Sequence, residues 1–341
     1  WGKARPLFKI TVCTSRMDNK FALKLRALFQ RLHLCKTNEG ISPRNILEKE
    51  QANSLIYEKL MSGQPCMIAR YGANELGIAV NYLGVREKKH SYLSYARGTT
   101  PAWWWNENLR YAISNNAGFF PATDEWLEKF AQLMISDSKY ADILGTSQPD
   151  ETYMECFLKD DVRYMRLSDF EPFWSPNPWS RALEGKRVLV VYPLADSIKE
   201  QYKKRELLFA NKDVLPKFAS LQAIKSIQSL GCAHQGFATW FDALRYMENE
   251  ISKAQFDVCL IGCGAYGFPL AAFVKRMGKQ AIQMGGSLQL LFGITGSRWD
   301  QPIKENGRIL DFTSLVNEHW IRPSASDKPA NYRQVENSCY W

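Results

Sequence analysis

The stretch FDVCLIGCGAYGFPLAAFVKRMGKQAIQMGG, residues 256–286, decides the fold class of this chain. It begins with a short apolar run, passes through a glycine-rich turn, continues as an apolar helix pattern closed by Gly278, and ends in a second apolar run. This order of strand, turn, helix and strand is a βαβ unit, which joins two parallel strands by a right-handed crossover. The stretch therefore predicts an α/β, Rossmann-like fold with a mostly parallel sheet flanked by helices.

The segments before this stretch repeat the same alternation. KRVLVVYP, residues 186–193, is a β-branched run of the kind buried in a parallel sheet, and the helical pattern of residues 197–209 follows it. LQAIKSI, residues 221–227, indicates a further strand, and residues 240–253 have the spacing of an amphipathic helix. Residues 181–300 are therefore expected to be a Rossmann-like part with glycine-rich strand exits.

MIARYGANELGIAV, residues 67–80, indicates a similar strand exit in the first half of the chain. A buried strand ending at Gly72 would place Arg70, Asn74 and Glu75 at its carboxyl end, where open α/β sheets hold their ligands. Charged groups cannot be buried without partners except at a large cost in free energy. The stretch is therefore either a surface turn or a site.

The N-terminal region predicts two helices. Residues 18–36 have the spacing of a basic amphipathic helix, for which a solvated face is the default reading and contact with the inner face of a membrane the alternative. Residues 36–45 read as a polar linker, and a second helix is expected over residues 44–62.

We divide the chain into four parts on these patterns. They are an N-terminal helical extension with its linker (1–41), a part that carries RYGANE (42–180), the Rossmann-like part (181–300), and a polar C-terminal segment that wraps the surface (301–341).

Composition indicates a soluble globular protein. Of the 341 residues, 45% are hydrophobic and 23% charged, and no apolar run reaches the roughly 18–20 residues that a membrane span needs. The first ten residues do not resemble a secretory signal, and the eight cysteines form no C-x-x-C pair. We therefore expect free thiols and a cytoplasmic location, with a peripheral membrane contact as the alternative.

The net charge of +9 would suit a phosphate-bearing ligand, an anionic membrane surface or nucleic acid. The basic residues are spread over several helices and no nucleic-acid-binding module is present, so no nucleic-acid partner is expected. The four histidines lack metal-ligand spacing, and neither a G-x-S-x-G elbow nor a P-loop occurs. Zinc hydrolases, serine hydrolases and P-loop enzymes therefore have no support.

Glycine-rich strand exits provide the anion-binding candidates. Gly262, Gly264 and Gly267 open the backbone at the start of a helix, and Gly285 and Gly286 could do the same at the next strand end. A dinucleotide-binding or methyltransferase fold would place an acid near the end of that strand, where Gln283 stands instead. Packing without a ligand remains the alternative for these turns.

Three further positions leave two readings open. Ser197 and Glu200 have capping-box spacing, so Ser197 either caps a helix or contacts phosphate. Arg298 could clamp a phosphate while Trp299 stacks on a base or sugar, or Arg298 pairs with Asp300 in a tight loop.

The aromatic-rich segments TPAWWW and NNAGFF, residues 100–105 and 115–120, offer stacking surfaces for a sugar or base. The candidate contact residues in these segments are Trp104, Asn116 and Phe119. Packing of helices and a loop wall is the structural alternative.

These motifs together resemble a known family. MIARYGANELG is similar to the aRFGDGE signature of GT-D-type glycosyltransferases, and residues 186–201, 256–282 and 285–300 resemble blocks of bacterial GT-D-like proteins linked to surface polysaccharide synthesis. The resemblance covers roughly residues 42–341. It implies a GT-D-type fold and a glycosyltransferase that moves a sugar from a nucleotide-diphosphate donor to a glycan or lipid-linked acceptor.

The resemblance also implies roles for individual residues. Glu75 would be the catalytic base. Donor contacts are expected from Arg70, Gly72, Asn74, Ser197, Gly264, Tyr266, Gly267, Gly285, Gly286, Gln289, Arg298 and Asp300. Acceptor or base stacking is expected from Trp104, Asn116, Phe119 and Trp299.

The metal stays open at this stage. The family uses an Asp-x-Glu pair with Mn²⁺ or Mg²⁺, but here Ala73 replaces the first acid and Glu75 retains the second. Arg70 or Arg298 would then offset the charge of the leaving diphosphate. A SAM-dependent methyltransferase, suggested by GCGAYG, and a non-catalytic assembly protein of a polysaccharide complex are the rival readings.

Overall fold

The computed structural model describes residues 16–35, 45–232, 235–305, 308–324, 327–328, 333 and 340. Contacts divide the chain into two compact units. The first combines Trp1–Asn38 with Asn81–Asn106, and the second combines Glu39–Val80 with Glu107–Trp341. The four-part division made from the sequence stays a prediction.

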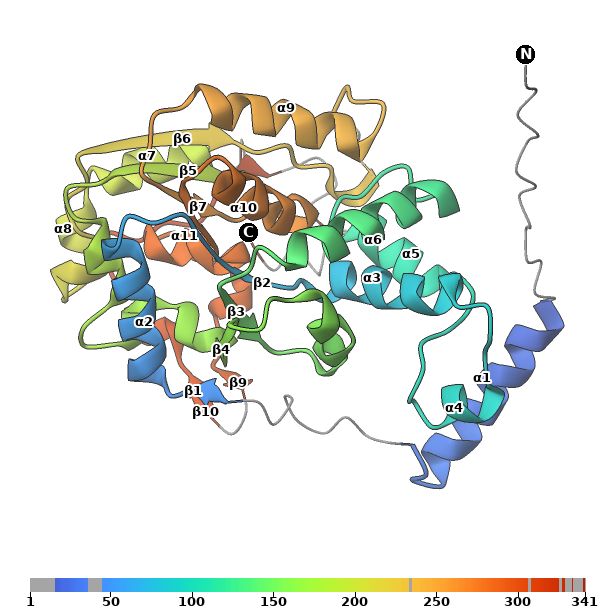
Figure 1. The fold of residues 1–341 in the computed structure, drawn as a ribbon. Helices are drawn as coiled ribbons and strands as arrows, with labels where there is room; N and C mark the ends of the chain where they lie inside the picture. Colours follow the sequence, from blue (N-terminus) through green and yellow to red (C-terminus); the bar gives the residue numbers. More distant parts are fainter. Residues whose placement is uncertain are drawn as a thin grey trace, which may run out of the picture. The chain divides into compact units, whose positions relative to one another are not determined.

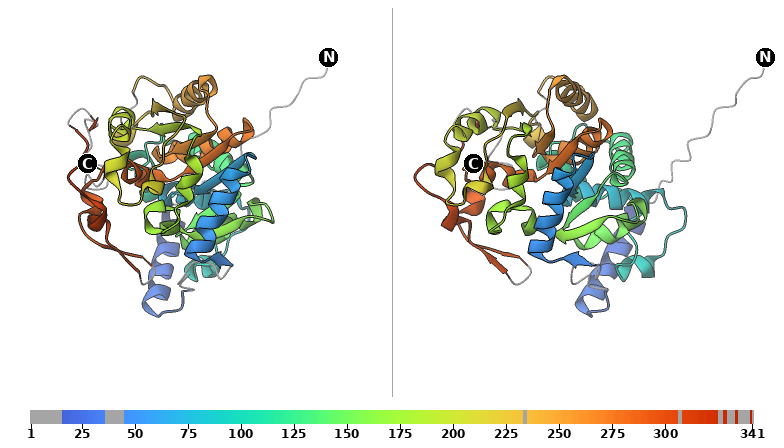
Figure 2. Two further views of the ribbon diagram at one scale, coloured as in Figure 1. Left: turned by 90° about the vertical axis from the view of Figure 1, so that its left-hand side faces the viewer. Right: turned by 60° about the vertical axis from the view of Figure 1, so that its left-hand side comes forward.

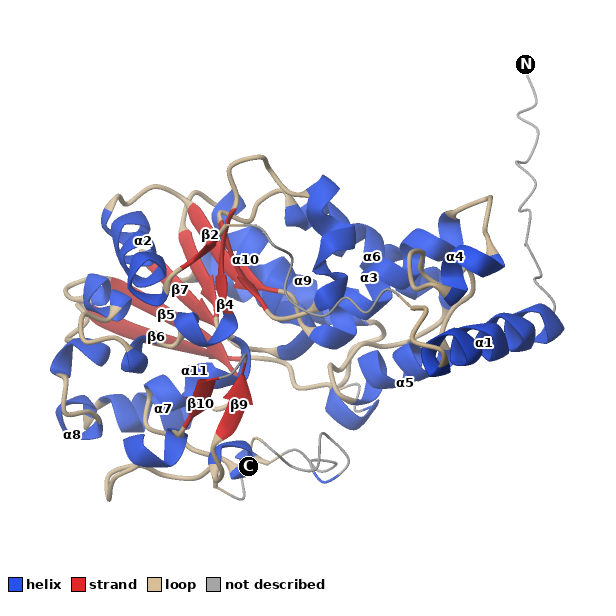
Figure 3. Ribbon diagram, turned by 90° about the horizontal axis from the view of Figure 1, so that it is seen from below, coloured by secondary structure: helices blue, strands red, loops and turns tan. Residues whose placement is uncertain are grey.

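The second unit is built on an eight-stranded sheet in which every pairing of neighbouring strands is parallel (Figures 1 and 3). The strand order is β1-β4-β3-β2-β8-β7-β5-β6. The strands are β1 (Ile46–Leu47), β2 (Cys66–Arg70), β3 (Ile143–Thr146), β4 (Arg163–Arg166), β5 (Arg187–Tyr192), β6 (Ser220–Lys225), β7 (Val258–Ile261) and β8 (Gln280–Gln283). The predicted α/β class with a mostly parallel sheet is confirmed, whereas the GT-D type stays a prediction.

The βαβ unit read from residues 256–286 is present as β7, α10 (Gly267–Arg276) and β8. The two strands pair in parallel with Val258 opposite Gln280. Gly278 follows the helix with φ at 77°, a left-handed conformation that glycine adopts without steric cost.

Helices cover both faces of this sheet. Helix α10 packs against α6 (Asp124–Ser138) and α9 (Trp240–Lys253) on one face (Figures 1 and 2). On the other face, Val188 and Val190 of β5 share a core cluster with Ile56 of α2 (Lys49–Met61) and Ile198 of α7 (Ala195–Tyr202). Burial on both faces explains why these strands read as continuous apolar runs in the sequence.

Strands β5 and β7 form the topological switch point of the sheet. They are neighbours, but the chain leaves β5 toward β6 on one side and leaves β7 toward β8 on the other. Right-handed connections therefore diverge from their carboxyl ends. Open parallel sheets bind ligands in the crevice that such a divergence creates.

The first unit is a small helical assembly. Helix α1 (Arg16–Arg31) packs on α4 (Tyr92–Ala96), and Ala22, Tyr95 and Trp103 form its core. The side chain of Asn81 donates to the Trp104 carbonyl at 2.9 Å and ties the tryptophan-rich loop to the end of α3 (Ala73–Arg86). The helix predicted over residues 18–36 is therefore present, but it ends at Arg31.

The structure corrects the sequence prediction in several places. The helix expected over 44–62 begins only at Lys49, because Ile46 and Leu47 pair with β4 as the short edge strand β1. Strands β3 and β4 were not expected within the aromatic-rich middle. The predicted linker lies almost entirely outside the described residues. The remaining α-helices and strands are α5 (Glu107–Asn115), α8 (Arg205–Leu208), α11 (Leu288–Leu291) and the hairpin of β9 (Ile303–Glu305) and β10 (Arg308–Leu310).

Candidate functional site

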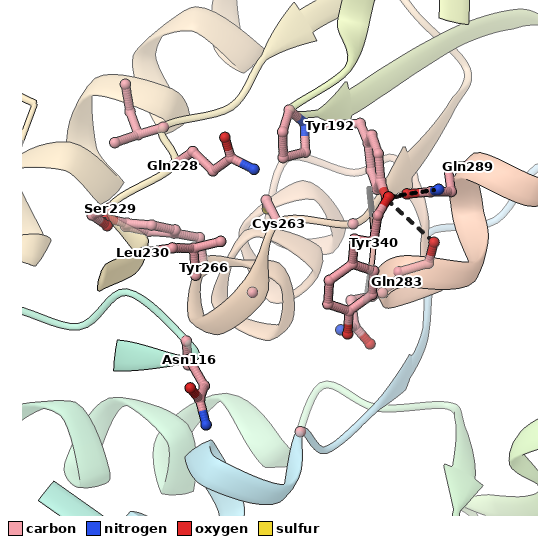
Figure 4. Close-up of a pocket in the computed structure, with 18 of the residues that line it drawn as sticks. Asn116, Tyr192, Gln228, Ser229, Leu230, Cys263, Tyr266, Gln283, Gln289 and Tyr340 are labelled. Atoms are coloured by element: carbon pink, nitrogen blue, oxygen red, sulfur yellow. Dashed lines mark hydrogen bonds between the residues drawn. The ribbon is translucent and has the colours of Figure 1, made fainter. Parts of the chain in front are cut away.

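A pocket of about 810 Å³, open to solvent, lies in the second unit at the carboxyl ends of five adjacent strands (Figure 4). Its walls come from the residues that end or directly follow β2, β8, β7, β5 and β6. Asn116, Ala117 and Tyr340 complete the lining. The pocket therefore includes the switch point between β5 and β7, where the topology predicts a ligand.

Arg70 stands at the end of β2 and is held in place through its backbone. Its amide donates to Oε1 of Gln283 at 2.9 Å, which joins the ends of β2 and β8. Its guanidinium packs so closely on Gly285 that a Cβ at Gly285 would lie 3.0 Å from Nε. Gly285 also has φ at 64°, a left-handed backbone conformation that favours glycine.

Glu75 lies in the first turn of α3, directly after the β2 exit. It is 8% exposed and lines the pocket. Its carboxylate lies against the Cα of Gly72, because a Cβ built there would overlap the carboxylate carbon and oxygens. Residues 67–80, in which charged residues interrupt an apolar run, thus place the Arg70 cation and the Glu75 carboxylate in the same pocket.

The turns after β7 and β8 contact each other directly. A Cβ at Gly262 would overlap the carbonyl oxygen of Gly285 and lie 2.8 Å from the ring of Tyr192. Gly264, with φ at 55°, begins the short turn that leads into α10. The Ala265 amide donates to the Ala117 carbonyl at 3.3 Å, so part of this helix start is already satisfied by the chain.

Replacing Gly262 by Ala is expected to lower the free energy of unfolding by about 1–3 kcal/mol, because the methyl group meets backbone that cannot rotate away. Urea unfolding would measure the change. Gly267→Ala is the matched control, since the nearest atoms to its methyl would be side-chain atoms of Gln283 at 3.1 Å and not backbone. Equal losses in the two variants would contradict the assigned contact.

Tyr192 and Gln289 form one wall by hydrogen bonding to each other. The Tyr192 hydroxyl lies 2.8 Å from Oε1 of Gln289 and 3.2 Å from the Gly286 carbonyl oxygen (Figure 4). Nε2 of Gln289 donates at 3.3 Å to the carbonyls of Thr295 and Tyr340. Gln289 is fully buried and both ends of its amide are used, so it shapes the wall.

Tyr340 reaches the pocket from near the end of the chain. Its ring packs on Gly286, where a Cβ would lie 3.1 Å from Cδ1 of the ring. Its hydroxyl accepts a hydrogen bond from Nη1 of Arg298 at 3.0 Å. The rings of Trp299 and Tyr340 pack edge to face, with 6.0 Å between their centroids. Arg298 therefore acts on the pocket through Tyr340.

Tyr266 forms the opposite wall with Ser229 (Figure 4). Its ring stacks on Trp240 at 4.8 Å, and its hydroxyl lies 2.8 Å from the Ser229 Oγ. Because Ser229 donates to the Gly118 carbonyl at 2.6 Å, Tyr266 is the donor of this pair. Burial raises the pKa of Tyr266 well above its ordinary value, so the hydroxyl stays protonated.

The pocket brings together nine of the residues expected from the sequence. They are Arg70, Gly72, Glu75, Asn116, Gly264, Tyr266, Gly285, Gly286 and Gln289. Their chemical roles stay predictions, although Gln289 is engaged as described above.

Several expected residues do not line this pocket. Ser197 is the third residue of α7, whose N-cap is Leu194, and it donates to Oδ2 of Asp327 at 2.8 Å, so the capping reading was wrong. Asp300 pairs with Arg322 and not with Arg298. Asn74 and Gly267 lie next to the pocket in sequence but outside its lining.

The expected stacking residues are mostly core residues. Phe119 is fully buried against Phe130 and Trp240. Trp299 is 3% exposed, and Trp104 packs within the first unit. The aromatic rings that do line the pocket, within the described residues, belong to Tyr192, Tyr266 and Tyr340.

Sequence reasoning missed part of the lining. Tyr192 precedes Pro193 at the end of KRVLVVYP, and Gln228 directly follows LQAIKSI. Arg70 was found because ligands bind at the carboxyl ends of strands, and the same rule would have found these two residues. Cys263 lies inside the glycine turn, and the sequence predicted only a free thiol there. No pattern in the sequence connects Tyr340 to these strands.

Glu151, which follows β3, is a further carboxyl group at this edge of the sheet. Burial raises its pKa, while hydrogen bonds from Thr146 and the amides of Ser147 and Gln148, together with the Arg70 charge, act in the opposite direction. Glu151 lines a separate, smaller pocket with Tyr71. Arg70 therefore experiences a negative charge beyond the main pocket.

The donor set of the pocket does not fit a metal held by the protein alone. Glu75 is the single carboxylate among its described lining residues. No group of three or more His, Cys, Asp and Glu residues within the described ranges could hold a metal ion. Mg²⁺ in enzymes is commonly bound by one or two carboxylates together with substrate phosphates, and without those phosphates the described lining offers it Glu75 alone, so no step is assigned to a metal.

No family model matches this chain, and no curated protein is similar enough to count as a match. Two solved structures of a domain of unknown function 1792 align over 92% of this chain and 98% of theirs, at 13% and 12% identity and a TM-score of 0.38 each. The second is described as having a distinct glycosyltransferase fold. Similarity at this level leaves the family of the chain open.

Proposed function

We propose that this protein is a glycosyltransferase that uses a nucleotide-diphosphate sugar. The observation that carries the proposal is a pocket at the switch point of a parallel sheet in which one cation, Arg70, lies beside glycine-lined backbone. Glycines allow a ligand to approach the main chain closely, and a guanidinium pairs bidentately with phosphate oxygens. This combination suits a diphosphate better than a neutral ligand.

In the proposed reaction, Glu75 takes the proton of an acceptor hydroxyl as its oxygen attacks the anomeric carbon. The bond from that carbon to the diphosphate breaks, and the nucleoside diphosphate leaves with the bonding electrons. Arg70 offsets the negative charge that develops on the leaving group. From the sequence resemblance, we propose a glycan or lipid-linked acceptor in surface polysaccharide synthesis.

A thermal-shift panel tests the donor class. UDP, GDP, CDP and S-adenosylhomocysteine are each added with Mn²⁺ or with EDTA, because a ligand that binds only the folded state raises the melting temperature. We expect at least one nucleoside diphosphate to raise it, corresponding to about 2.7 kcal/mol at 100 times its Kd. A shift with S-adenosylhomocysteine alone would favour a methyltransferase, and no shift at all would favour a non-catalytic assembly protein.

Glu75→Gln is expected to slow release of nucleoside diphosphate from the donor by about 10²–10⁴-fold while donor binding persists, because the amide cannot accept the proton. Rate and thermal shift are measured on the same sample. Glu151→Gln is the matched control and should keep most of the rate, because Glu151 lies outside this pocket. Full activity in a folded Glu75→Gln protein would remove Glu75 from the mechanism.

A further inference from the structure

Helix α1 of the first unit presents a row of exposed apolar side chains. Phe21 and Leu28 lie seven residues apart, and the turn continues to Leu32, whose amide donates to the Leu28 carbonyl at 3.0 Å. At 3.6 residues per turn these three side chains share one face. They are 58%, 49% and 55% exposed, respectively. Among the described residues, they form an apolar row that is exposed over about half of its surface.

The packed side of the same helix is different. Ala22 is fully buried against the Tyr95 and Trp103 cluster, and the Arg26 guanidinium lies 4.8 Å from the centre of the Tyr95 ring. The helix thus already uses one face to hold the first unit together. Of the apolar row, Phe21 touches this packing through an edge contact with Tyr92, at 5.5 Å between the ring centroids, whereas Leu28 and Leu32 lie outside the cluster.

A basic row runs beside the apolar one. Lys20, Lys24 and Arg31 are all exposed and are offset from the apolar row by less than about a third of a turn. Asp18 is the one acid in residues 16–35. Lys20, Lys24 and Arg31 form no ion pair within the described part of the chain.

Helix α7 is the other lysine-rich helix, and its basic residues are paired with acids. In α7 and just after it, Lys199 pairs with Asp196 and Lys203 with Glu200, each three residues away. Acids at helical spacing neutralise that surface. The positive charge of α1 is not balanced in this way.

We propose that α1 docks the protein on an anionic lipid bilayer, with the apolar row among the acyl chains and the basic row at the headgroups. Long lysine and arginine side chains reach sideways to phosphates while their stems cover apolar surface. Helices with this arrangement lie in the plane of the interface. No helix in the described ranges is long and apolar enough to cross a membrane. Docking of α1 does not depend on what the pocket binds.

Vesicle co-sedimentation tests the proposal. The full chain is mixed with vesicles of phosphatidylcholine containing 30 mol% phosphatidylglycerol, or of phosphatidylcholine alone, and the salt concentration is varied. We expect binding to the anionic vesicles that weakens as salt rises, because salt screens the basic row. Equal binding to both vesicles, or to neither, would overturn the proposal.

Two variants with matched controls locate the contact. Lys20→Gln, Lys24→Gln and Arg31→Gln together should lower the association constant about a hundredfold. Lys199→Gln, Lys203→Gln and Lys253→Gln change the net charge equally and should leave it within about twofold. Equal losses in the two triples would show that overall charge acts, and would overturn the assignment to α1.

The apolar row is tested in the same assay. Phe21→Ser, Leu28→Ser and Leu32→Ser together should lower binding at least about a hundredfold. Ile309→Ser, at a 68% exposed position of β10, is the control that should bind normally. Circular dichroism checks that each variant is folded. If the serine triple instead halves the mass in light scattering and leaves vesicle binding intact, a second copy covers the row and the proposal fails.

Discussion

Arg70→Ala is expected to slow release of nucleoside diphosphate about 10²–10³-fold, because the leaving diphosphate would lose the one cation among the described pocket-lining residues. The effect on binding should be smaller. A hydrogen bond to a charged group contributes about 1.5–3 kcal/mol, so the Kd for the nucleoside diphosphate should rise about tenfold or more. Rates and thermal shifts with the diphosphate identified in the panel provide both numbers.

The fold should tolerate this substitution. The link between β2 and β8 at this point runs through the Arg70 amide and Gln283, which the alanine variant retains. Arg298→Ala is the comparison, because Arg298 is not among the described pocket-lining residues and donates to the hydroxyl of Tyr340, which is; this variant should lose much less rate. A folded Arg70→Ala protein whose rate falls less than Arg298→Ala would contradict the role given to Arg70.

The strands that were predictable from the sequence are mainly those whose residues form apolar runs. The runs that became β5 and β7 contain almost only apolar residues, and β8, QAIQ, was found with them because it follows the predicted helix of the βαβ unit. Strand β4 reads RYMR, with an arginine at each end, and β1 has two residues, so neither shows a strand pattern. Strand β3, ILGT, is buried throughout but has only two large apolar residues, and it was missed as well.

The candidate site was predictable where its residues follow predicted strands. Arg70, Gly264 and Gly285 were found because each comes directly after an apolar run. The stacking residues were assigned wrongly, because the sequence does not distinguish an aromatic residue in the core from one that lines a binding pocket. Phe119 and Trp299 lie in cores that form only when distant segments pack.

Contacts between distant segments also explain why Tyr340 and Arg298 could not be paired from the sequence. They are 42 residues apart and share no periodic pattern. Their hydrogen bond depends on the glycine at 286, which leaves room for the tyrosine ring. Glycine can be recognised as a sign of close approach, but the sequence does not name the group that approaches.

Asp142→Ala is expected to lower the free energy of unfolding by about 3 kcal/mol at pH 7. Its carboxylate is 7% exposed and accepts hydrogen bonds from Lys159 at 2.7 Å, Lys275 at 2.6 Å and the Met67 amide at 2.7 Å. It therefore joins β2, β3 and α10 at the end of the sheet opposite the pocket. Removing it leaves two ammonium groups and an amide without this partner in a largely buried place. Urea unfolding measures the loss.

The same network predicts how stability depends on pH. Burial alone would raise the pKa of Asp142, but the hydrogen bonds from Lys159, Lys275 and Met67 outweigh it, and the pKa lies below its ordinary value. A carboxyl group whose pKa is lower in the folded state stabilises the fold above its unfolded pKa, and this contribution is lost as the pH falls through the folded value. The difference between wild type and Asp142→Ala should thus be full above about pH 5 and shrink below about pH 4.

Asp257→Asn removes an ordinary surface ion pair and serves as the comparison for the buried Asp142 network. Asp257 pairs with Arg187 at 2.6 Å, but both side chains are more than a third exposed, so solvent screens their attraction. The loss in this variant should stay within about 1 kcal/mol. The assignment of Asp142 would be wrong if the two variants lost equal stability at pH 7, because burial and the second lysine are what distinguish them.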